Sequence, residues 1–167
     1  MKLIFLDVDG VLNSEEYIVK EHDRLGHEIY IKTYLQQGGI PFDLKCLKFL
    51  KYIIDKTNAL ICVSSTWRLS KDQRERLNVA LGSYANRIIG YSPHFGFEKA
   101  RGFEIEQFLN NLKEIKCPLE NYIIIDDDND MKEEQMEHLI LTNYKTGLTI
   151  EDAIKSVEKL NKKEKQE

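Results

Sequence analysis

The segment Lys2–Val8 reads KLIFLDV and continues through DGVLN at residues 9–13. It is a nearly continuous apolar run that stops at acidic residues and Gly10. Two later apolar runs repeat this design and stop at hydroxyl or acidic residues: ALICVSST at 59–66 and YIIIDDD at 122–128. Short apolar runs without alternation are typical of strands buried on both faces, so these three segments predict the inner strands of a parallel sheet.

Segments with the spacing of amphipathic helices separate the three runs. Ser70 with Gln73, and Thr149 with Asp152, are typical of residues that cap the start of a helix. A further strand is predicted at His138–Thr142, and helices are predicted at about 44–54, 71–81, 102–115 and 150–160. The alternation of strands and helices predicts an α/β fold with a doubly wound, mostly parallel sheet.

Two regions are too long or too irregular to be simple connections between strands and helices. Residues 13–43 contain Gly38-Gly39, Pro41 and a possible strand at Glu28–Tyr34, and we expect a flap or small cap there. Residues 82–101 are rich in aromatic side chains: Tyr84, Tyr91, Phe95 and Phe97. We therefore expect one domain over residues 1–160, followed by a charged tail at 161–167.

Composition narrows the class of protein. The chain has 167 residues, of which 42% are hydrophobic and 31% charged, as in an ordinary soluble domain. A net charge of -4 argues against broad, non-specific binding to nucleic acid but leaves room for a local basic site. Three widely spaced cysteines form neither a disulfide framework nor a zinc site. With no run long enough for a signal peptide or membrane span, we expect a cytoplasmic protein without membrane contact or an obligate protein partner.

The predicted strands end in residues that carry oxygen. In an open parallel α/β sheet, ligands bind outside the carboxyl ends of the strands. One crevice should therefore gather the side chains of Asp7, Asp9, Ser64, Ser65, Asp126, Asp127 and Asp130. Carboxylates packed this closely repel one another unless a cation or raised pKa values compensate. A hard divalent cation such as Mg²⁺ meets this need, and the chain has no His/Cys ligand set that indicates zinc.

Each motif taken singly also has a purely structural explanation. A DxD turn is common, a Ser-Ser-Thr segment can cap a helix, and an acidic run can be a solvated turn. The first motif is more specific, because Gly10 lets the chain leave the strand tightly and strand alternation puts Asp7 and Asp9 on a common side. The joint occurrence of the three motifs favours a functional site over these structural explanations.

These motifs resemble those of the haloacid-dehalogenase (HAD) superfamily of phosphohydrolases. DVDGVLN is similar to its first motif, the Ser after ALICV to its second, and IIIDDDND to its fourth, while the third is a Lys or Arg. More narrowly, VSSTWR, RGFEI, YIIIDDDNDM and TGLTIEDA resemble a small HAD group typified by domains in bacterial RNA-repair proteins. The resemblance extends from Met1 to about Leu160.

The resemblance implies a role for each acidic residue and for one serine. Asp7 is the nucleophile that forms an aspartyl-phosphate, and Asp9 is the general acid and then the general base. Ser64, with Ser65 as the alternative, hydrogen bonds to the phosphoryl oxygens. The implied cofactor is Mg²⁺, held by Asp7, the backbone carbonyl of Asp9 and Asp126, with Asp127 as the alternative ligand and Asp130 orienting the metal shell.

The cationic residue of the site has two candidates. Lys99 and Arg101 both precede the helix that leads into the acidic strand, where the family places this residue, and the resemblance of the RG before the helix to the small HAD group favours Arg101. Arg68 and Gly10 are candidates for substrate binding. Trp67 is expected to pack, with stacking on a base as the alternative.

Three classes of function fit the motifs. The favoured one is a phosphomonoester hydrolase, acting on a phosphorylated small molecule, a nucleotide or a nucleic-acid end. A signalling receiver uses a similar acidic cluster, and a catalytically idle fold would be a phosphate-binding module. Asp9 favours hydrolysis over the receiver function and over dehalogenation, because it provides a proton donor two residues beyond the nucleophile. The presence of all the acidic positions argues against an idle fold.

Overall fold

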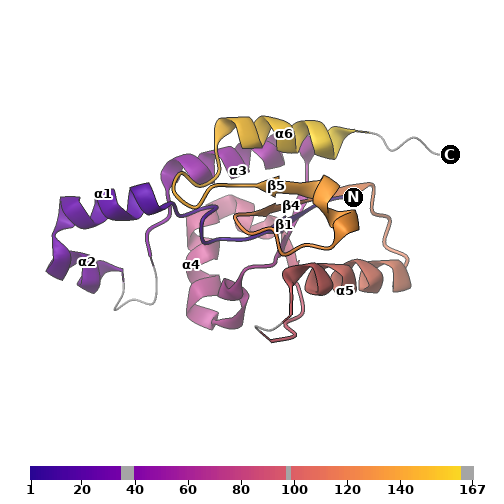
Figure 1. Ribbon diagram of the computed structural model, residues 1–167, viewed down its shortest axis with the longest axis horizontal. Helices are drawn as coiled ribbons and strands as arrows, with labels where there is room; N and C mark the ends of the chain where they lie inside the picture. Colours follow the sequence, from indigo (N-terminus) through magenta and orange to yellow (C-terminus); the bar gives the residue numbers. More distant parts are fainter. Residues whose placement is uncertain (35–39, 97–98, 163–167) are drawn as a thin grey trace.

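The computed structural model describes residues 1–34, 40–96 and 99–162. It contains a five-stranded, all-parallel sheet in the order β3-β2-β1-β4-β5 (Figure 1). The strands are β1 (Lys2–Leu6), β2 (Leu60–Val63), β3 (Ile88–Tyr91), β4 (Asn121–Asp126) and β5 (Leu139–Leu141). The three apolar runs are β1, β2 and β4, at the centre of the sheet, and the strand predicted near residue 140 is β5. The α/β fold predicted from the sequence is confirmed.

The central strand β1 is buried on both faces. Ile4 and Leu6 belong to one hydrophobic cluster, whereas Leu3 and Phe5 belong to a second cluster on the opposite face. All four side chains are fully buried. Every side chain of β1 has an apolar layer to pack against, which explains why apolar and polar residues do not alternate along this strand.

Helices cover both faces of the sheet. The first cluster receives side chains from α3 (Leu44–Thr57), α4 (Lys71–Leu81) and α6 (Ile150–Asn161), and the second from α5 (Arg101–Glu114). Figure 1 shows α3 and α6 on one side of the sheet and α5 on the other. The predicted caps are present: Ser70 Oγ accepts from the backbone of α4, and Thr149 and Asp152 form a capping box at α6.

The strand β3 is absent from the sequence prediction. It lies at the sheet edge within the aromatic region, after a short 3₁₀ helix, η3 (Gly82–Arg87), and its residues are only partly buried. Gly90 interrupts the apolar pattern because the Phe108 ring of α5 packs where a side chain would project: a Cβ there would lie 3.2 Å from Phe108 Cε2. A short, half-exposed edge strand with a glycine leaves little trace in the sequence.

The strand predicted at Glu28–Tyr34 is wrong. This segment is α2 (His27–Thr33), which forms a hairpin with α1 (Glu15–Leu25) that projects from the side of the sheet (Figure 1). The β-branched residues of this segment suggested a strand. In the structure, helical spacing turns Tyr30 toward α1, where its ring is buried with its centre 5.2 Å from the centre of the His22 ring. Tertiary packing outweighs the weak strand propensity of the segment.

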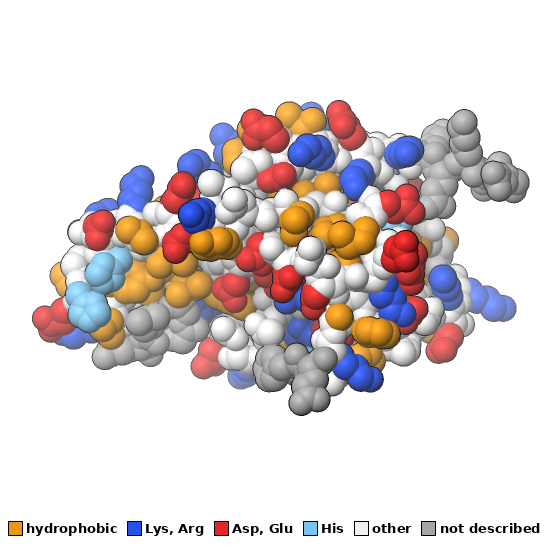
Figure 2. All heavy atoms as spheres, in the orientation of Figure 1, with side chains coloured by type: hydrophobic (Ala, Val, Ile, Leu, Met, Phe, Trp, Pro, Cys, Tyr) orange, Lys and Arg blue, Asp and Glu red, His pale blue; other side chains and the backbone are white. Residues whose placement is uncertain are grey.

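The hairpin carries apolar surface. Hydrophobic side chains gather over α1 and α2 in the space-filling view (Figure 2), and Val19 and Ile29 are each more than half exposed. Its role as a cap stays a prediction. The Gly38-Gly39 pair, Phe97 and the tail from residue 163 lie outside the described residues. None of the helices in the described ranges has both the length and the hydrophobicity to cross a bilayer.

Candidate active site

Three carboxylates lie close together where the adjacent strands β1 and β4 end. Asp7 directly follows β1, and its backbone N–H donates to the carbonyl of Ile125 in the neighbouring strand β4, which ends at Asp126. One oxygen each from Asp7, Asp126 and Asp127 lies within 4.8 Å of the others. Strand pairing therefore creates the cluster, because Leu6 and Ile125 stand side by side in the register of the sheet.

Burial makes this cluster electrostatically unfavourable. Asp126 is fully buried and Asp7 nearly so, whereas Asp127 is partly exposed. Burial, followed by the nearby charge of Asp7, raises the pKa of Asp126 to about 8. Burial also raises the pKa of Asp7 and of Asp127 above their usual range. Only added positive charge lets all three carboxylates ionise at neutral pH.

Arg101 supplies part of that positive charge. Its Nη1 donates to Asp7 Oδ1 at 2.5 Å and to Asp126 Oδ2 at 2.8 Å. Burial disfavours its charged form, but the two carboxylates outweigh burial and raise the pKa of Arg101. Lys99 is instead exposed, with its ammonium 5.3 Å from the centre of the Phe95 ring. Of the two predicted cations, the structure thus brings Arg101 to the carboxylates.

Asp130 fixes the start of α5. Its Oδ2 accepts from the backbone N–H of Arg101 at 2.8 Å, and its carbonyl accepts from that of Gly102. Ala100, the residue before the helix, provides no side-chain cap, so Asp130 caps α5 from the loop after β4. Asp130 lies outside the group of three carboxylates and reaches the site through Arg101.

Asp9 lies at the exposed side of the site. Its Oδ1 accepts from Asn13 Nδ2 at 2.8 Å, and its Oδ2 accepts from the indole Nε1 of Trp67 at 3.0 Å. The sequence indicated that Trp67 packs, and it is buried against Phe42. Its hydrogen bond to Asp9 was missed, because nothing in the spacing shows which way the indole N–H points.

Gly10 and the two serines shape the loops beside the carboxylates. Gly10 has a φ of 68°, and a Cβ there would lie 2.3 Å from Asp127 Oδ2, so only glycine leaves room for that carboxylate. Burial is the largest influence on the pKa of Asp7 and raises it, while the Ser65 hydroxyl has a smaller, lowering effect. Ser64 is fully buried, and its Oγ has no hydrogen-bond partner among the described residues. Of the two predicted serines, Ser65 is thus the one whose hydroxyl influences the pKa of Asp7.

Arg68 lies inside the protein, nearly fully buried. A guanidinium has five N–H donors. Here they reach four backbone carbonyls and one carboxylate: Ser92 at 2.9 Å, Ser64 at 2.5 Å, Ser65 at 2.7 Å, Pro93 at 3.0 Å and Glu104 at 2.6 Å. The arginine thus joins the loops after β2 and β3 to α5. Glu104 was missed as its partner, because the two are 36 positions apart in the sequence.

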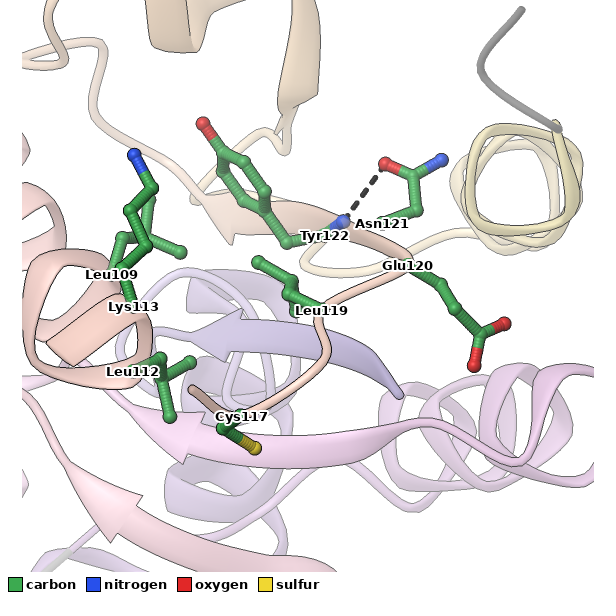
Figure 3. A pocket seen from close by; sticks show the side chains of 8 residues that line it. All are labelled: Leu109, Leu112, Lys113, Cys117, Leu119, Glu120, Asn121 and Tyr122. Carbon is green, nitrogen blue, oxygen red and sulfur yellow. Dashed lines mark hydrogen bonds between the residues drawn. The ribbon is translucent and has the colours of Figure 1, made fainter. Parts of the chain in front are cut away.

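A separate hollow of about 250 Å³ lies at the opposite end of the sheet, beside the start of β4 (Figure 3). Leu109, Leu112 and Lys113 of α5 line it together with Cys117, Leu119 and the first residues of β4. It lies at the amino end of β4, whereas Asp126 is at the carboxyl end. This hollow is therefore distinct from the carboxylate cluster.

The carboxylate cluster predicts how the metal-free protein responds to pH. An acid whose pKa is raised by folding holds more protons in the folded than in the unfolded state, so stability falls as pH rises. For Asp126 this window runs from its usual value of 3.8 to about 8. We expect Asp126→Asn to raise the melting temperature of the chelator-treated protein at pH 8 by a few degrees, about 1 kcal/mol or more. Thermal unfolding of both proteins at pH 5 and 8 tests this, and a variant that melts below the wild type at pH 8 would contradict it.

Comparison with known proteins agrees with this geometry. The model of the family described as "HAD domain in Swiss Army Knife RNA repair proteins" matches residues 3–153. No curated protein and no solved structure matches the chain significantly. The matched range includes β4, all of β1 after its first residue, all three clustered carboxylates and Arg101. The chain therefore belongs to the HAD domains of Swiss Army Knife RNA repair proteins, and so to a superfamily of HAD-type hydrolases.

Proposed function

We propose that this chain is a Mg²⁺-dependent phosphomonoester hydrolase with Asp7 as its nucleophile. The observation that carries the proposal is the set of clustered oxygens of Asp7, Asp126 and Asp127 within 4.8 Å, with the Arg101 guanidinium bound to two of these residues. Asp9 is held two residues beyond the nucleophile on the exposed side. This arrangement combines a nucleophile, a proton carrier and positive charge, the groups that phosphoryl transfer to a carboxylate requires.

The donor set fits a hard divalent cation. All three clustered groups are carboxylates, and oxygen ligands of this kind suit Mg²⁺ better than zinc or copper. Asp7, Asp126 and Asp127 would hold the ion, with the backbone carbonyl of Asp9 as a further predicted oxygen. When bound, the ion supplies positive charge that offsets both the repulsion among the carboxylates and the charge of a phosphate.

The protein groups account for both halves of the reaction. A carboxylate oxygen of Asp7 attacks phosphorus, and the bond from phosphorus to the leaving oxygen breaks as Asp9 gives that oxygen its proton. Asp9 then takes a proton from water, which attacks the aspartyl-phosphate to release inorganic phosphate and restore Asp7. In this proposal the N–H groups of Arg101 and the hydroxyl of Ser65 donate to the phosphoryl oxygens.

We propose nucleotides or nucleic-acid ends as the substrate class. The family takes its description from RNA repair proteins. Two exposed aromatic rings near the start of α5 also have cations close to them: Lys99 lies over the ring of Phe95, and Lys132 lies 4.5 Å from the centre of the ring of Phe103. Rings and cations of this kind suit bases and phosphates.

The metal dependence tests the proposed activity directly. With para-nitrophenyl phosphate as substrate, we expect turnover in Mg²⁺ that falls at least about 100-fold with a chelator and returns when Mg²⁺ is restored. Absence of turnover, with stable phosphorylation of Asp7, would instead favour the receiver function.

A panel of 3′- and 5′-phosphorylated RNA and DNA beside phosphorylated metabolites tests the substrate class. Equal inertness toward every oligonucleotide would reject nucleic-acid ends and leave the hydrolase intact.

A further inference from the structure

Asp9 is an exposed carboxylate that is nevertheless anchored at both oxygens. An exposed aspartate normally samples several rotamers in water. Here Oδ1 accepts from Asn13 at 2.8 Å and Oδ2 accepts from Trp67 at 3.0 Å. Each carboxylate oxygen has two lone pairs, so each can still accept one further hydrogen bond. The two hydrogen bonds therefore restrict the direction of the Asp9 carboxylate and leave each of its oxygens able to accept a further hydrogen bond.

Both donors are themselves fixed by their surroundings. Trp67 and Asn13 are each only 2% exposed. The Trp67 ring packs against Phe42, with ring centres 5.2 Å apart, and its backbone N–H donates to Ser65 Oγ. The Asn13 side chain accepts from the backbone N–H of Gly10 through Oδ1, which turns its NH₂ group toward Asp9. Rigid donors transmit their position to the group that they hold.

We propose that Trp67 and Asn13 are positioning residues that hold Asp9 ready to transfer a proton to the leaving oxygen. The inference rests on the phosphatase activity proposed above. Proton transfer needs its donor within hydrogen-bond reach and in the right direction, so a carboxylate free to rotate would spend less time in the reactive geometry. Trp67, which extends from the core to an exposed carboxylate, thereby links the packing of the domain to the second aspartate of its first motif.

The dependence on the leaving group separates positioning from packing. Trp67→Phe keeps an aromatic ring in the core and removes the N–H donor. The quantity to compare is kcat/KM, which reports the steps up to departure of the leaving group. We expect a loss of about tenfold on phenyl phosphate, whose leaving oxygen needs a proton, and of about twofold on 2,4-dinitrophenyl phosphate, whose leaving group departs easily as an anion. Asn13→Ala should show the same difference between the two substrates.

Phe42→Leu is the matched control, because it disturbs the packing of the same tryptophan and leaves its N–H in place. Any loss in this variant should be equal on the two substrates. Equal losses in Trp67→Phe, in a preparation whose wild type is active, would overturn the positioning role and leave the phosphatase proposal standing. A wild type that hydrolyses neither phosphoester overturns both.

A readout that does not depend on turnover tests the contact itself. Trp67 is the only tryptophan in the 167 residues, so the protein should give a single indole N–H signal in a ¹H–¹⁵N spectrum. We expect this signal to move in Asp9→Asn and to stay in place in Asp72→Asn, which changes an exposed aspartate on α4. An indole signal that is indifferent to Asp9→Asn would reject the hydrogen bond and with it the inference.

Discussion

Replacing Asp7 with Asn should lower kcat on para-nitrophenyl phosphate by at least about 10³-fold, because an amide oxygen cannot form the aspartyl-phosphate. The substitution should not unfold the protein. Burial raises the pKa of Asp7, so the ionised carboxylate opposes folding of the metal-free chain, and a neutral amide of the same shape removes that opposition. Loss of activity together with an unchanged or higher melting temperature is therefore the expected pair of results.

The same substitution at an exposed aspartate provides the control. Asp72 lies in the first turn of α4, away from the three clustered carboxylates, and Asp72→Asn should keep full activity. Mass spectrometry of wild type mixed with substrate should locate the transient phosphate on Asp7. Residual activity in Asp7→Asn above about a tenth of wild type would reject Asp7 as the nucleophile.

The sequence predicted the acidic site because its residues follow strands that the apolar pattern identifies. Asp7, Asp126 and Asp127 stand directly after buried runs, and adjacent parallel strands bring such residues together. The choice between Lys99 and Arg101 depended on the start of α5, which Asp130 sets from another loop. That contact is not contained in local spacing.

The rest of the fold was likewise predicted only in part from the sequence. Strands buried on both faces and helices with a capping serine or threonine were predicted with bounds close to those observed. The edge strand β3 was missed because it is half-exposed and holds Gly90 for the Phe108 ring. The segment α2 was mistaken for a strand because its β-branched residues fit both periods, and only the contact of Tyr30 with α1 decides between them.

The second large effect is expected in stability. Glu104→Ala should lower the free energy of unfolding by about 3–5 kcal/mol, because it leaves the Arg68 guanidinium buried without its counter-charge. The two side chains are 3% and 6% exposed, and the bond between them is 2.6 Å. Glu104 also accepts from the backbone N–H of Phe95, so its loss frees a second donor. For a chain of this size the melting temperature should fall by roughly 10 °C.

Glu106→Ala is the matched control for this prediction. Glu106 lies on the same helix, two residues further along, and its ion pair with Lys132 is also 2.6 Å long. Its side chain is 42% exposed, so the pair is screened by water and its loss should cost less than about 1 kcal/mol. Denaturant unfolding of both variants measures the difference, and equal destabilisation would contradict the prediction.

The two variants share the type of substituted residue, the helix and the ion-pair distance, so the difference between them reports mainly the burial of Glu104 and its additional bond to Phe95. It also bears on the site. Arg68 holds the carbonyls of Ser64 and Ser65, while Glu104 lies one turn beyond Arg101. Arg68→Met would remove a side-chain donor from four backbone carbonyls, of which only that of Ser65 also accepts from the backbone N–H of residue 68, and it would leave Glu104 buried without its counter-charge. It should therefore destabilise the protein at least as much as Glu104→Ala. Since both variants remove the same ion pair, the loss in the double variant should be smaller than the sum of the two single losses.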